Sequence, residues 1–490
     1  MALLTDPVTN GVTPVPSDYW AKVSRLLNTT VFYNVRNQDF GAAGDGIAND
    51  RLAIQNCINN STAGSTILFP PGTYLVDAPI VRKPNRHYIG MGGWSDDCVI
   101  KVANNSSANF QATGGVSGVL VPESWDSNAT VATGPVTIMG LAVNGNRANN
   151  ATGQHCGFIL GHGEYWSHYE NLYAYECKLD GFRFTPLGKN GSSLMAAGIS
   201  DFRIRDLLAT QNTGNGMRSI KSGGRFETDI VWDGNNLMFF NDESGVFIDE
   251  AANWQIDHLH MWQNGKHGMR CADGSYACRF QHIYVEDIGR LGTSGEFLSG
   301  VEIKTFNGRS PTLHDCTVSV NVPLSGVNHR GIVVNANDTD AHAWVHDNEV
   351  RAEGVATSAM YGFVFDNGSG GSKLTLHEHT NHAYGFVAGQ DKGFFGTATY
   401  AFDPPRVMTG SAAWTPGAIG ANSGATTSVT VIGAALGDQI AVGYNQDLQA
   451  GLILTAEVSA ANTVTAQIRN VTAGSLTPTA GTVRVTVWKH

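Results

Sequence analysis

The sequence predicts an all-β protein: a parallel β-helix (solenoid) with a short N-terminal capping helix, followed by a C-terminal β-sandwich. Three observations support this prediction. A glycine followed by a short strand recurs along residues 157–388, a second apolar strand usually precedes each copy, and no step leaves room for a long helix. Steps of 23 to 35 residues are typical of stacked arrays, and their irregular lengths favour a β-helix. A β-sandwich or a propeller is the alternative.

Each copy of the repeat carries apolar residues at the first and third positions after its glycine. This period of two indicates a strand with one buried face. The repeat glycines are Gly157, Gly181, Gly216, Gly245, Gly268, Gly300, Gly331 and Gly362, with Gly385 as a last candidate. Upstream strands are expected at residues 171–175 and 282–285.

The composition limits the functions that the chain can have. Of 490 residues only 15% are charged, the formal net charge is −11, and no basic block occurs, so nucleic acid is not an expected partner. No apolar run has the length of a membrane span, and membrane insertion is therefore not expected. The seven cysteines match no zinc-binding spacing. We expect them to be buried, reduced thiols.

The N-terminal part contains two expected helices. Within the segment 1–30, residues 18–27 are the first, and whether this segment is a truncated anchor is left open. The second is expected near 50–59, with Asn49 as its N-cap. Its apolar side is expected to consist of Leu52, Ile54, Cys57 and Ile58. A helix here would cover the apolar end of the first coil.

Residues 33–76 carry the most specific pattern of the chain. It runs through Asp39-Phe40-Gly41-Ala42-Ala43-Gly44-Asp45-Gly46, the expected helix, and Phe69-Pro70-Pro71-Gly72-Thr73-Tyr74. This pattern resembles the pectate-lyase-3 group of the pectin-lyase-like superfamily, which is common in phage tailspikes. The resemblance implies a right-handed β-helix, a homotrimer, attachment to phage tail or baseplate proteins in the virion tail, and action on bacterial surface polysaccharide. The matching residues include no catalytic one.

The β-helix domain is expected to span residues 31–405 and to end at Asp403-Pro404-Pro405, which breaks strand structure. Residues 406–490 have few charges and alternating runs at 427–431 and 482–488, which predict a β-sandwich. The stretch 434–438 resembles C-terminal modules of phage tail proteins, and this implies trimerisation or glycan binding. A simple cap on the last coil is the alternative.

The outward positions of the repeated strand predict a charged stripe. If the apolar positions face inward, the second and fourth positions after each glycine face solvent. The charged residues at these positions are Arg183, Arg218, Asp249, Arg270, Glu302 and Lys304. Arginine suits sugar carboxylates, so the stripe predicts an acidic polysaccharide as ligand. Simple solvation of an exposed face is the alternative.

Acidic residues around the central copy predict glycoside hydrolysis by paired carboxylates. Such a pair lies about 5 to 9.5 Å apart, according to the stereochemistry of the reaction. Asp249 is the first candidate, and its candidate partners are Glu243, Asp242 and Glu302. Turn stabilisation by these acids is the alternative.

A lyase that acts by β-elimination is the second interpretation. It needs a cation beside a uronate carboxylate and a base for the adjacent proton. His267 or Lys304 is the candidate base, and Tyr284 the candidate acid. The candidate substrate-binding residues for either reaction are Arg183, Arg218, Arg270, Lys304, Glu250, Trp254 and Tyr284. For Trp254, as for Trp262, a place in the core is the alternative to sugar stacking.

No cofactor and no metal site are predicted. His258 and His260 alternate along an expected strand, so both should face the same way, with His267 nearby. Histidines at a surface are more often hydrogen-bonded than metal-bound. A tail fibre that binds a glycan without cleaving it, and a structural solenoid without a ligand, are the remaining interpretations.

Overall fold

The computed structural model describes residues 32–489, except for positions 93, 95–96, 113, 115, 197–198, 306–309, 337–339, 367–372, 396–399 and 403–405. The helix predicted at 18–27 lies outside the described residues. The chain divides into two compact units. Unit 1 comprises Met1–Thr213 and Ser222–Arg225, and unit 2 comprises Gly214–Lys221 and Phe226–His490. Each unit is described by itself.

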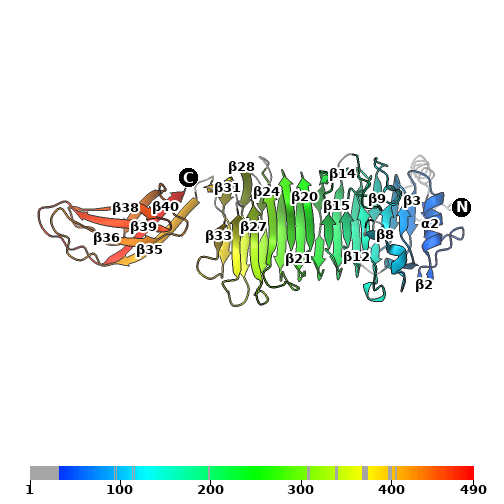
Figure 1. Cartoon of the computed structure of the whole chain (residues 1–490), viewed down its shortest axis with the longest axis horizontal. Coiled ribbons are helices and arrows are strands. Elements are labelled where there is room, and N and C mark those ends of the chain that lie inside the picture. Colours follow the sequence, from blue (N-terminus) through cyan, green and yellow to red (C-terminus); the bar gives the residue numbers. More distant parts are fainter. Residues whose placement is uncertain are drawn as a thin grey trace, which may run out of the picture. The chain divides into compact units, whose positions relative to one another are not determined.

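Unit 1 consists of stacked parallel strands that form two sheets joined by short corners (Figure 1). The first sheet contains β1 (Phe32–Asn34), β2 (Asp45–Asn49), β3 (Thr66–Phe69), β4 (Gly72–Val76), β6 (Arg86–Gly90), β7 (Cys98–Val102), β9 (Val136–Met139), β10 (Ala142–Asn144), β12 (His168–Tyr175) and β15 (Arg203–Thr210). The second contains β5 (Ile80–Arg82), β8 (Ser117–Pro122), β11 (His155–Leu160) and β13 (Phe182–Phe184). Shorter elements are η1 (Ser107–Phe110), α3 (Glu123–Asp126), η2 (Arg147–Asn149) and β14 (Ile199–Ser200).

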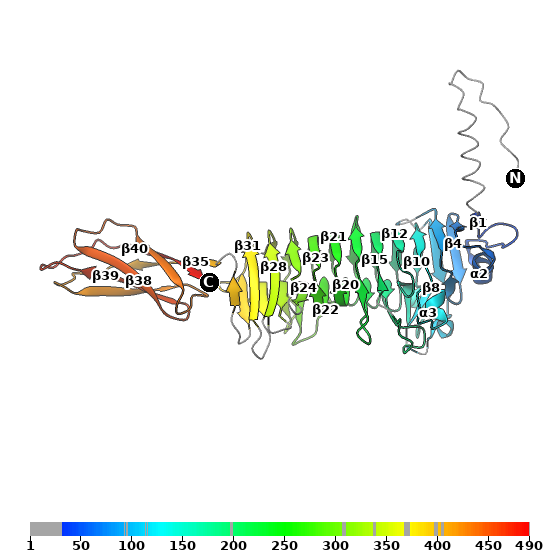
Figure 2. The same ribbon diagram turned by 90° about the horizontal axis from the view of Figure 1, so that it is seen from above.

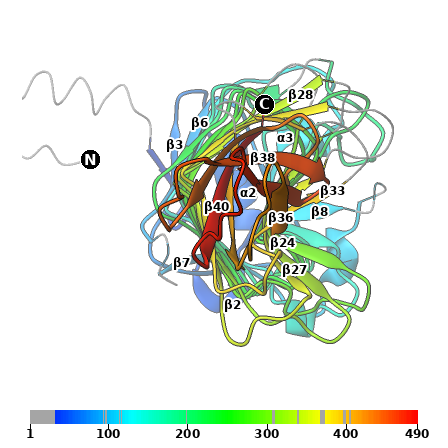
Figure 3. The ribbon, with the colours of Figure 1, turned by 90° about the vertical axis from the view of Figure 1, so that its left-hand side faces the viewer.

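Helix α2 (Arg51–Asn60) contacts β1, β4 and β5 at the first coils, and the end-on view shows it within the outline of the coils (Figure 3). Ile54, Cys57 and Ile58 are buried as predicted, but Leu52 is 64% exposed, so the prediction was wrong there. The N-cap position is held by Asp50 instead of Asn49. Its carboxylate accepts the N–H groups of Ala43 and Gly44, which fixes the preceding loop.

Unit 2 repeats the same architecture, again with two parallel sheets. One sheet contains β18 (Val231–Asp233), β19 (Asn236–Phe239), β21 (Gln255–Trp262), β23 (Arg279–Glu286), β25 (Thr312–His314), β26 (Thr317–Val320), β28 (Asp340–His346), β29 (Glu349–Ala352), β31 (Lys373–His379), β32 (His382–Tyr384) and β34 (Tyr400–Phe402). The other contains β16 (Met217–Ser219), β17 (Glu227–Thr228), β20 (Val246–Ala252), β22 (Met269–Tyr276), β24 (Phe297–Thr305), β27 (Asn328–Asn335), β30 (Met360–Asp366) and β33 (Lys392–Phe395). The prediction of an all-β parallel β-helix is confirmed.

The recurring glycine has a packing cause. A Cβ atom added to Gly268 would lie 2.5 Å from the carbonyl oxygen of Gly300, the glycine of the next coil, and 2.6 Å from Val285 Cγ1. The same clash with the following coil recurs at Gly157, Gly216, Gly245, Gly300, Gly331 and Gly362. The glycine therefore lets adjacent coils approach closely, and this contact repeats along each unit.

Replacing Gly268 by alanine is expected to destabilise the β-helix by about 1–3 kcal/mol, because neither the backbone oxygen nor the buried valine can yield without strain. Gly443→Ala is the control, since no atom lies within 4 Å of its added Cβ. Denaturant unfolding followed by far-ultraviolet circular dichroism measures both. Equal stabilities of the two variants would contradict the packing explanation.

The last coil departs from the prediction. Residues 385–388 form no strand, and the strand that follows β30 in the sheet is β33, with Phe363 opposite Lys392. Gly362 thus faces Asp391, whose carbonyl oxygen lies 2.4 Å from its hypothetical Cβ. At the turns, asparagine side chains bond one coil to the next, as in the 2.9 Å bond from Asn348 to Asn381.

The C-terminal residues form the predicted β-sandwich, with two antiparallel three-stranded sheets. Their strands are β35 (Arg406–Trp414), β40 (Gly481–Lys489) and β37 (Gln439–Tyr444) in one sheet, and β36 (Gly424–Thr430), β39 (Thr463–Asn470) and β38 (Leu452–Ala460) in the other. All seven cysteines are buried and free, as predicted. Within the described ranges, no helix has the length and apolar character needed to cross a membrane.

Candidate active site on the β16–β24 face

The predicted stripe exists on one face of unit 2. Arg218, Phe247, Arg270 and Glu302 occupy equivalent positions on the successive strands β16, β20, β22 and β24. Seen from above, β20, β22 and β24 lie along one side of the unit, and β21, β23 and β28 lie along the other (Figure 2). The buried residues that alternate with the stripe confirm the predicted register.

Two guanidinium groups flank one aromatic ring in the stripe. The Cζ atom of Arg218 lies 4.4 Å from the centre of the Phe247 ring, and that of Arg270 lies 5.7 Å from it. Cation–π contacts of this kind orient both side chains. The face therefore presents two positive groups on either side of a ring, an arrangement suited to a sugar that carries carboxylates.

Asp249 lies beside Arg218 at the edge of this layer. Its Oδ1 accepts a hydrogen bond of 2.9 Å from the Arg218 guanidinium, and its Oδ2 accepts one of 3.1 Å from the Lys221 backbone N–H. Its side chain is 19% exposed, so it keeps access to solvent. Asp249 is thus an oriented carboxylate at the surface of the stripe.

Three residues near Asp249 were not predicted from the sequence. Lys221 forms an ion pair with Glu250, and Tyr276 donates a 2.6 Å hydrogen bond to the same carboxylate. Glu250 is only 2% exposed, so it supports the site from within instead of contacting a ligand. Tyr276 in turn stacks on Phe226, with ring centres 5.9 Å apart. The third unpredicted residue is Glu227.

Glu227 is a fully buried carboxyl group on β17. Burial raises its pKa from an ordinary 4.5 to about 8, and the negative charge of Asp249 contributes in the same direction. One oxygen bonds to the Ser219 hydroxyl, and the other has no hydrogen-bond partner within the described part of the chain. At neutral pH Glu227 therefore carries a proton while Asp249 lies close by.

The raised pKa of Glu227 makes stability depend on pH. The native state keeps a proton that the unfolded chain loses, so the free energy of unfolding should fall as pH rises from 4.5 to about 8, and then level off. A slope of about 1 kcal/mol per pH unit is expected. Glu227→Gln, which mimics the protonated acid, should flatten this slope in a series of denaturant titrations. An unchanged slope in the variant would contradict the assignment.

Glu302 was expected to face solvent, and this prediction was wrong: the side chain is 4% exposed and is held by several partners. Its carboxylate lies 3.3 Å from Arg270 Nε and 3.4 Å from an Arg330 terminal nitrogen. The Ser299 hydroxyl and the Asn335 amide each donate a 3.0 Å hydrogen bond to it. This set of donors fixes the orientation of the carboxylate.

His267 lies beside Glu302, but it is 6% exposed. Its Nδ1 accepts the Ser299 backbone N–H at 3.1 Å, so the ring proton of the neutral form is on Nε2. Burial lowers the pKa of His267 to about 4, and it is therefore neutral at physiological pH. A neutral ring is the form that a base requires, although burial separates it from the surface.

The other predicted residues lie apart from this cluster. Arg183 belongs to unit 1, is 11% exposed, and pairs with Asp180 at 2.5 Å. Trp254 is completely buried, and its indole N–H donates to the Glu227 carbonyl. Tyr284 lies on β23, in the other sheet, where its ring contacts that of His260. The predictions that Trp254 contacts a sugar and that Tyr284 contacts a ligand on the stripe were therefore wrong.

Asp242 and Glu243 precede the strand at the end opposite to Asp249. Asp242 pairs with Arg290 at 2.9 Å. At about 3.3 Å per residue, the strand separates both acids from Asp249 by more than about 10 Å. They do not form a hydrolytic pair with it. Lys304 is half-buried on β24 opposite Asn335 of the next coil, still on the predicted face.

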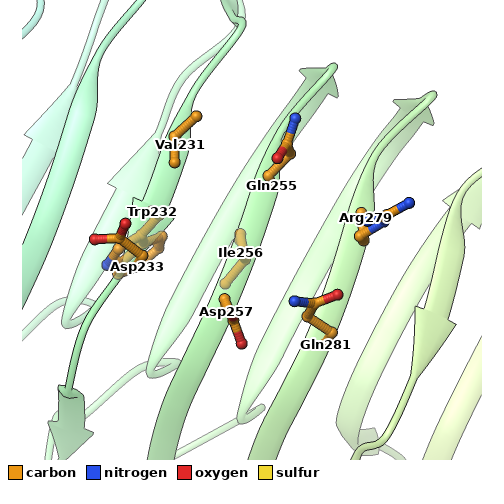
Figure 4. Close-up of a pocket in the computed structure, with 8 residues that line it drawn as sticks. All are labelled: Val231, Trp232, Asp233, Gln255, Ile256, Asp257, Arg279 and Gln281. Carbon is orange, nitrogen blue, oxygen red and sulfur yellow. The ribbon is translucent and has the colours of Figure 1, made fainter.

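A separate hollow of about 220 Å³ lies on the other sheet of unit 2. Figure 4 shows its lining side chains on the neighbouring strands β18, β21 and β23, among them Asp233, Asp257 and Arg279. The hollow shares no residue with the stripe. The outward row of strand positions that lines it was not considered in the sequence-based prediction.

Comparisons with known proteins match the predicted family. A family model described as rhamnogalacturonase A/epimerase, pectate lyase-like, covers residues 32–321. Mannuronan C5-epimerase AlgE1 of Azotobacter vinelandii is 28% identical over 287 residues, which are 56% of this chain and 18% of that protein. A capsule K30/K69-specific depolymerase of Klebsiella phage K64-1 is 27% identical over 257 residues, 48% of this chain and 31% of that protein.

The chain thus spans less than a third of the length of these two relatives. Among solved structures, the ORF18 protein of Geobacillus virus E2 is 15% identical, with a TM-score of 0.42 over 97% of this chain and 80% of that one. The family model covers more than half of the chain, including β16, β20, β22 and β24. The chain therefore belongs to the rhamnogalacturonase A/epimerase, pectate lyase-like family.

Proposed function

We propose that this protein is a tailspike-like depolymerase that binds an acidic polysaccharide of a bacterial surface on the β16–β24 face and cleaves it. The names of two relatives support a polysaccharide as substrate: one is a capsule-specific depolymerase of a phage, and the other is a mannuronan epimerase. The observation that carries the proposal is the layer of Arg218, Phe247 and Arg270 beside the carboxylate of Asp249.

Glycosidic hydrolysis is the proposed reaction. Glu227 holds a proton near neutral pH, because burial raises its pKa to about 8. In this proposal the proton of Glu227 passes through Asp249 to the leaving oxygen, and the proton released by the attacking water restores it. Glu302, which is 4% exposed and two coils away from Phe247, orients Arg270 in this proposal.

Elimination is the second candidate, and one observation favours it. Arg218 and Arg270 are placed to neutralise a uronate carboxylate, which is the first requirement of that reaction. The acid proposed from the sequence, Tyr284, lies on the other sheet. Tyr276, on β22, is the tyrosine beside Glu250 and Lys221, and it would take that role.

The test is digestion of purified surface polysaccharides, with two measurements on the same samples. New reducing ends without ultraviolet absorbance would support hydrolysis. New reducing ends with the absorbance of a 4,5-unsaturated uronate would support elimination. A polysaccharide that binds but yields no product would contradict cleavage and favour a receptor-binding fibre.

The proposal includes assembly as a homotrimer that is attached to a phage tail or baseplate. The C-terminal β-sandwich would then serve trimerisation or glycan binding. Light scattering of the purified protein should give the mass of three chains. A monomer at micromolar concentration would contradict this part alone, because cleavage is measured separately.

A further inference from the structure

A row of histidines follows one corner of unit 2, away from the stripe. His314, His346 and His379 end the successive strands β25, β28 and β31, and they are in register. Their rings stack at 5.0 Å and 4.7 Å, with interplanar angles of 6° and 14°. Three imidazoles are thus lined up along a corner that is open to solvent.

Each of these histidines is followed by a polar residue with a left-handed backbone. Asp315, Asp347 and Thr380 have φ values of 53°, 57° and 53°. This turn directs the Asp347 carboxylate back to His346, with a 2.8 Å distance between Oδ2 and Nδ1. Thr380 donates to the other oxygen of Asp347 at 2.5 Å. The carboxylate is therefore held between two coils.

We propose that His346, Asp347 and His379 bind a divalent transition-metal ion such as Zn²⁺ or Ni²⁺. Their ligand atoms lie within 4.8 Å of one another. Tetrahedral coordination with bonds of about 2.1 Å brings such atoms to about 3.4 Å apart, which small rotations of exposed side chains can achieve. Imidazole nitrogen with one carboxylate suits zinc, nickel or copper, whereas magnesium and calcium prefer oxygen ligands.

The surroundings favour a bound ion over three separate hydrogen bonds. The side chain of Asp347 is 46% exposed and that of His346 is 22% exposed, so water can complete the coordination shell. His314 is one coil away and can supply a further imidazole. An ion at this corner would join β28 to β31 by bonds that the parallel ladder alone does not provide.

A second group at the same corner has the reverse order of residues. Asp257 lies on β21 directly before His258, and His258 and His282 have the left-handed conformation, with φ values of 57° and 50°. One oxygen of Asp257 already lies 2.8 Å and 2.7 Å from the two imidazoles. The two contacts engage the same carboxylate oxygen, whereas in the His346 group the contacts are divided between two oxygens of Asp347 and a further imidazole, His314, is adjacent. We therefore assign the metal to the His346 group.

Calorimetric titration of the tag-free, chelator-treated chain with ZnCl₂ tests the proposal. We expect saturable binding near one ion per chain and an upward shift of the thermal unfolding midpoint. His379→Ala and His346→Ala should weaken binding by more than about tenfold. His382→Ala, a matched exposed histidine on β32, should bind as the parent does.

Three outcomes would overturn the proposal: no binding of Zn²⁺ or Ni²⁺, equal binding in the His379→Ala and parent proteins, or equal binding of Mg²⁺. If the parent binds two ions and His379→Ala binds one, the lost ion is assigned to His346, Asp347 and His379, and the proposal is supported. Circular dichroism of each variant confirms that it is folded. The polysaccharide assays do not enter this test, so its outcome is independent of the proposed function.

Discussion

Replacing Asp249 by asparagine is expected to lower the rate of polysaccharide cleavage by about 10²–10⁴-fold, the usual contribution of a positioned acid or base. Asparagine keeps the acceptor oxygen for Arg218 or Lys221, so the fold and the binding of the polysaccharide should be retained. Initial rates of reducing-end formation measure the first effect. Retention on an immobilised polysaccharide measures the second.

Asp242→Asn is the matched control for this experiment. Asp242 also pairs with an arginine at 2.9 Å, but it lies at the opposite end of the β20 coil. The control should keep nearly the full rate. If both variants cleave equally well, Asp249 has no catalytic role, and the carboxyl pair has to be sought elsewhere. If only the control is impaired, the sequence-based pairing of Asp242 with another acid would be restored.

The stripe could be predicted because the glycine repeat fixes its register. A close contact between glycine and the next coil recurs at the same strand position, so alignment of the glycines also aligns Arg218, Phe247, Arg270 and Glu302. Alternation along a strand then decides which face each side chain occupies. This local rule needs no knowledge of the loops, and it was sufficient for the fold and for one face of the site.

The rule fails where the backbone leaves the extended conformation. Alternation along the strand predicted that His258 and His260 face the same way. His258 has a φ of 57°, so it faces a different way from His260. His258 bonds to Asp257 and stacks on His282, whereas His260 contacts Glu286. A single left-handed residue at a corner cannot be recognised from the period of the strand.

Glu227 was missed for a different reason. It lies on the two-residue strand β17, between two copies of the repeat, where no periodic signal exists. Only the folded chain shows that it is buried beside Ser219 and Asp249. Lys221 and Tyr276 likewise converge on Glu250 from different strands or turns. Convergence of this kind depends on loop conformation, which the repeat does not determine.

The largest effect on stability is expected in unit 1, at the buried ion pair between Arg82 and Glu164. Arg82 has no exposed surface, and its guanidinium bonds to both carboxylate oxygens at 2.8 Å and 2.7 Å. It also donates to the carbonyl groups of Leu120 and Ile159, and Tyr169 donates to Glu164. Every member of this network is buried, so the loss of one charge leaves the other without compensation.

Glu164→Gln is therefore expected to lower the free energy of unfolding by about 3–5 kcal/mol, because Arg82 would remain charged in a dry environment. Asp126→Asn is the control. This substitution breaks the 2.7 Å ion pair between Asp126 and Lys189, whose side chains are 34% and 37% exposed. It should lower the free energy of unfolding by at most about 1 kcal/mol. Denaturant unfolding of the three proteins, followed by tryptophan fluorescence, compares them. Equal losses would show that solvent reaches Arg82, whereas a loss confined to Glu164→Gln would establish the pair as a buried link between the coils of unit 1.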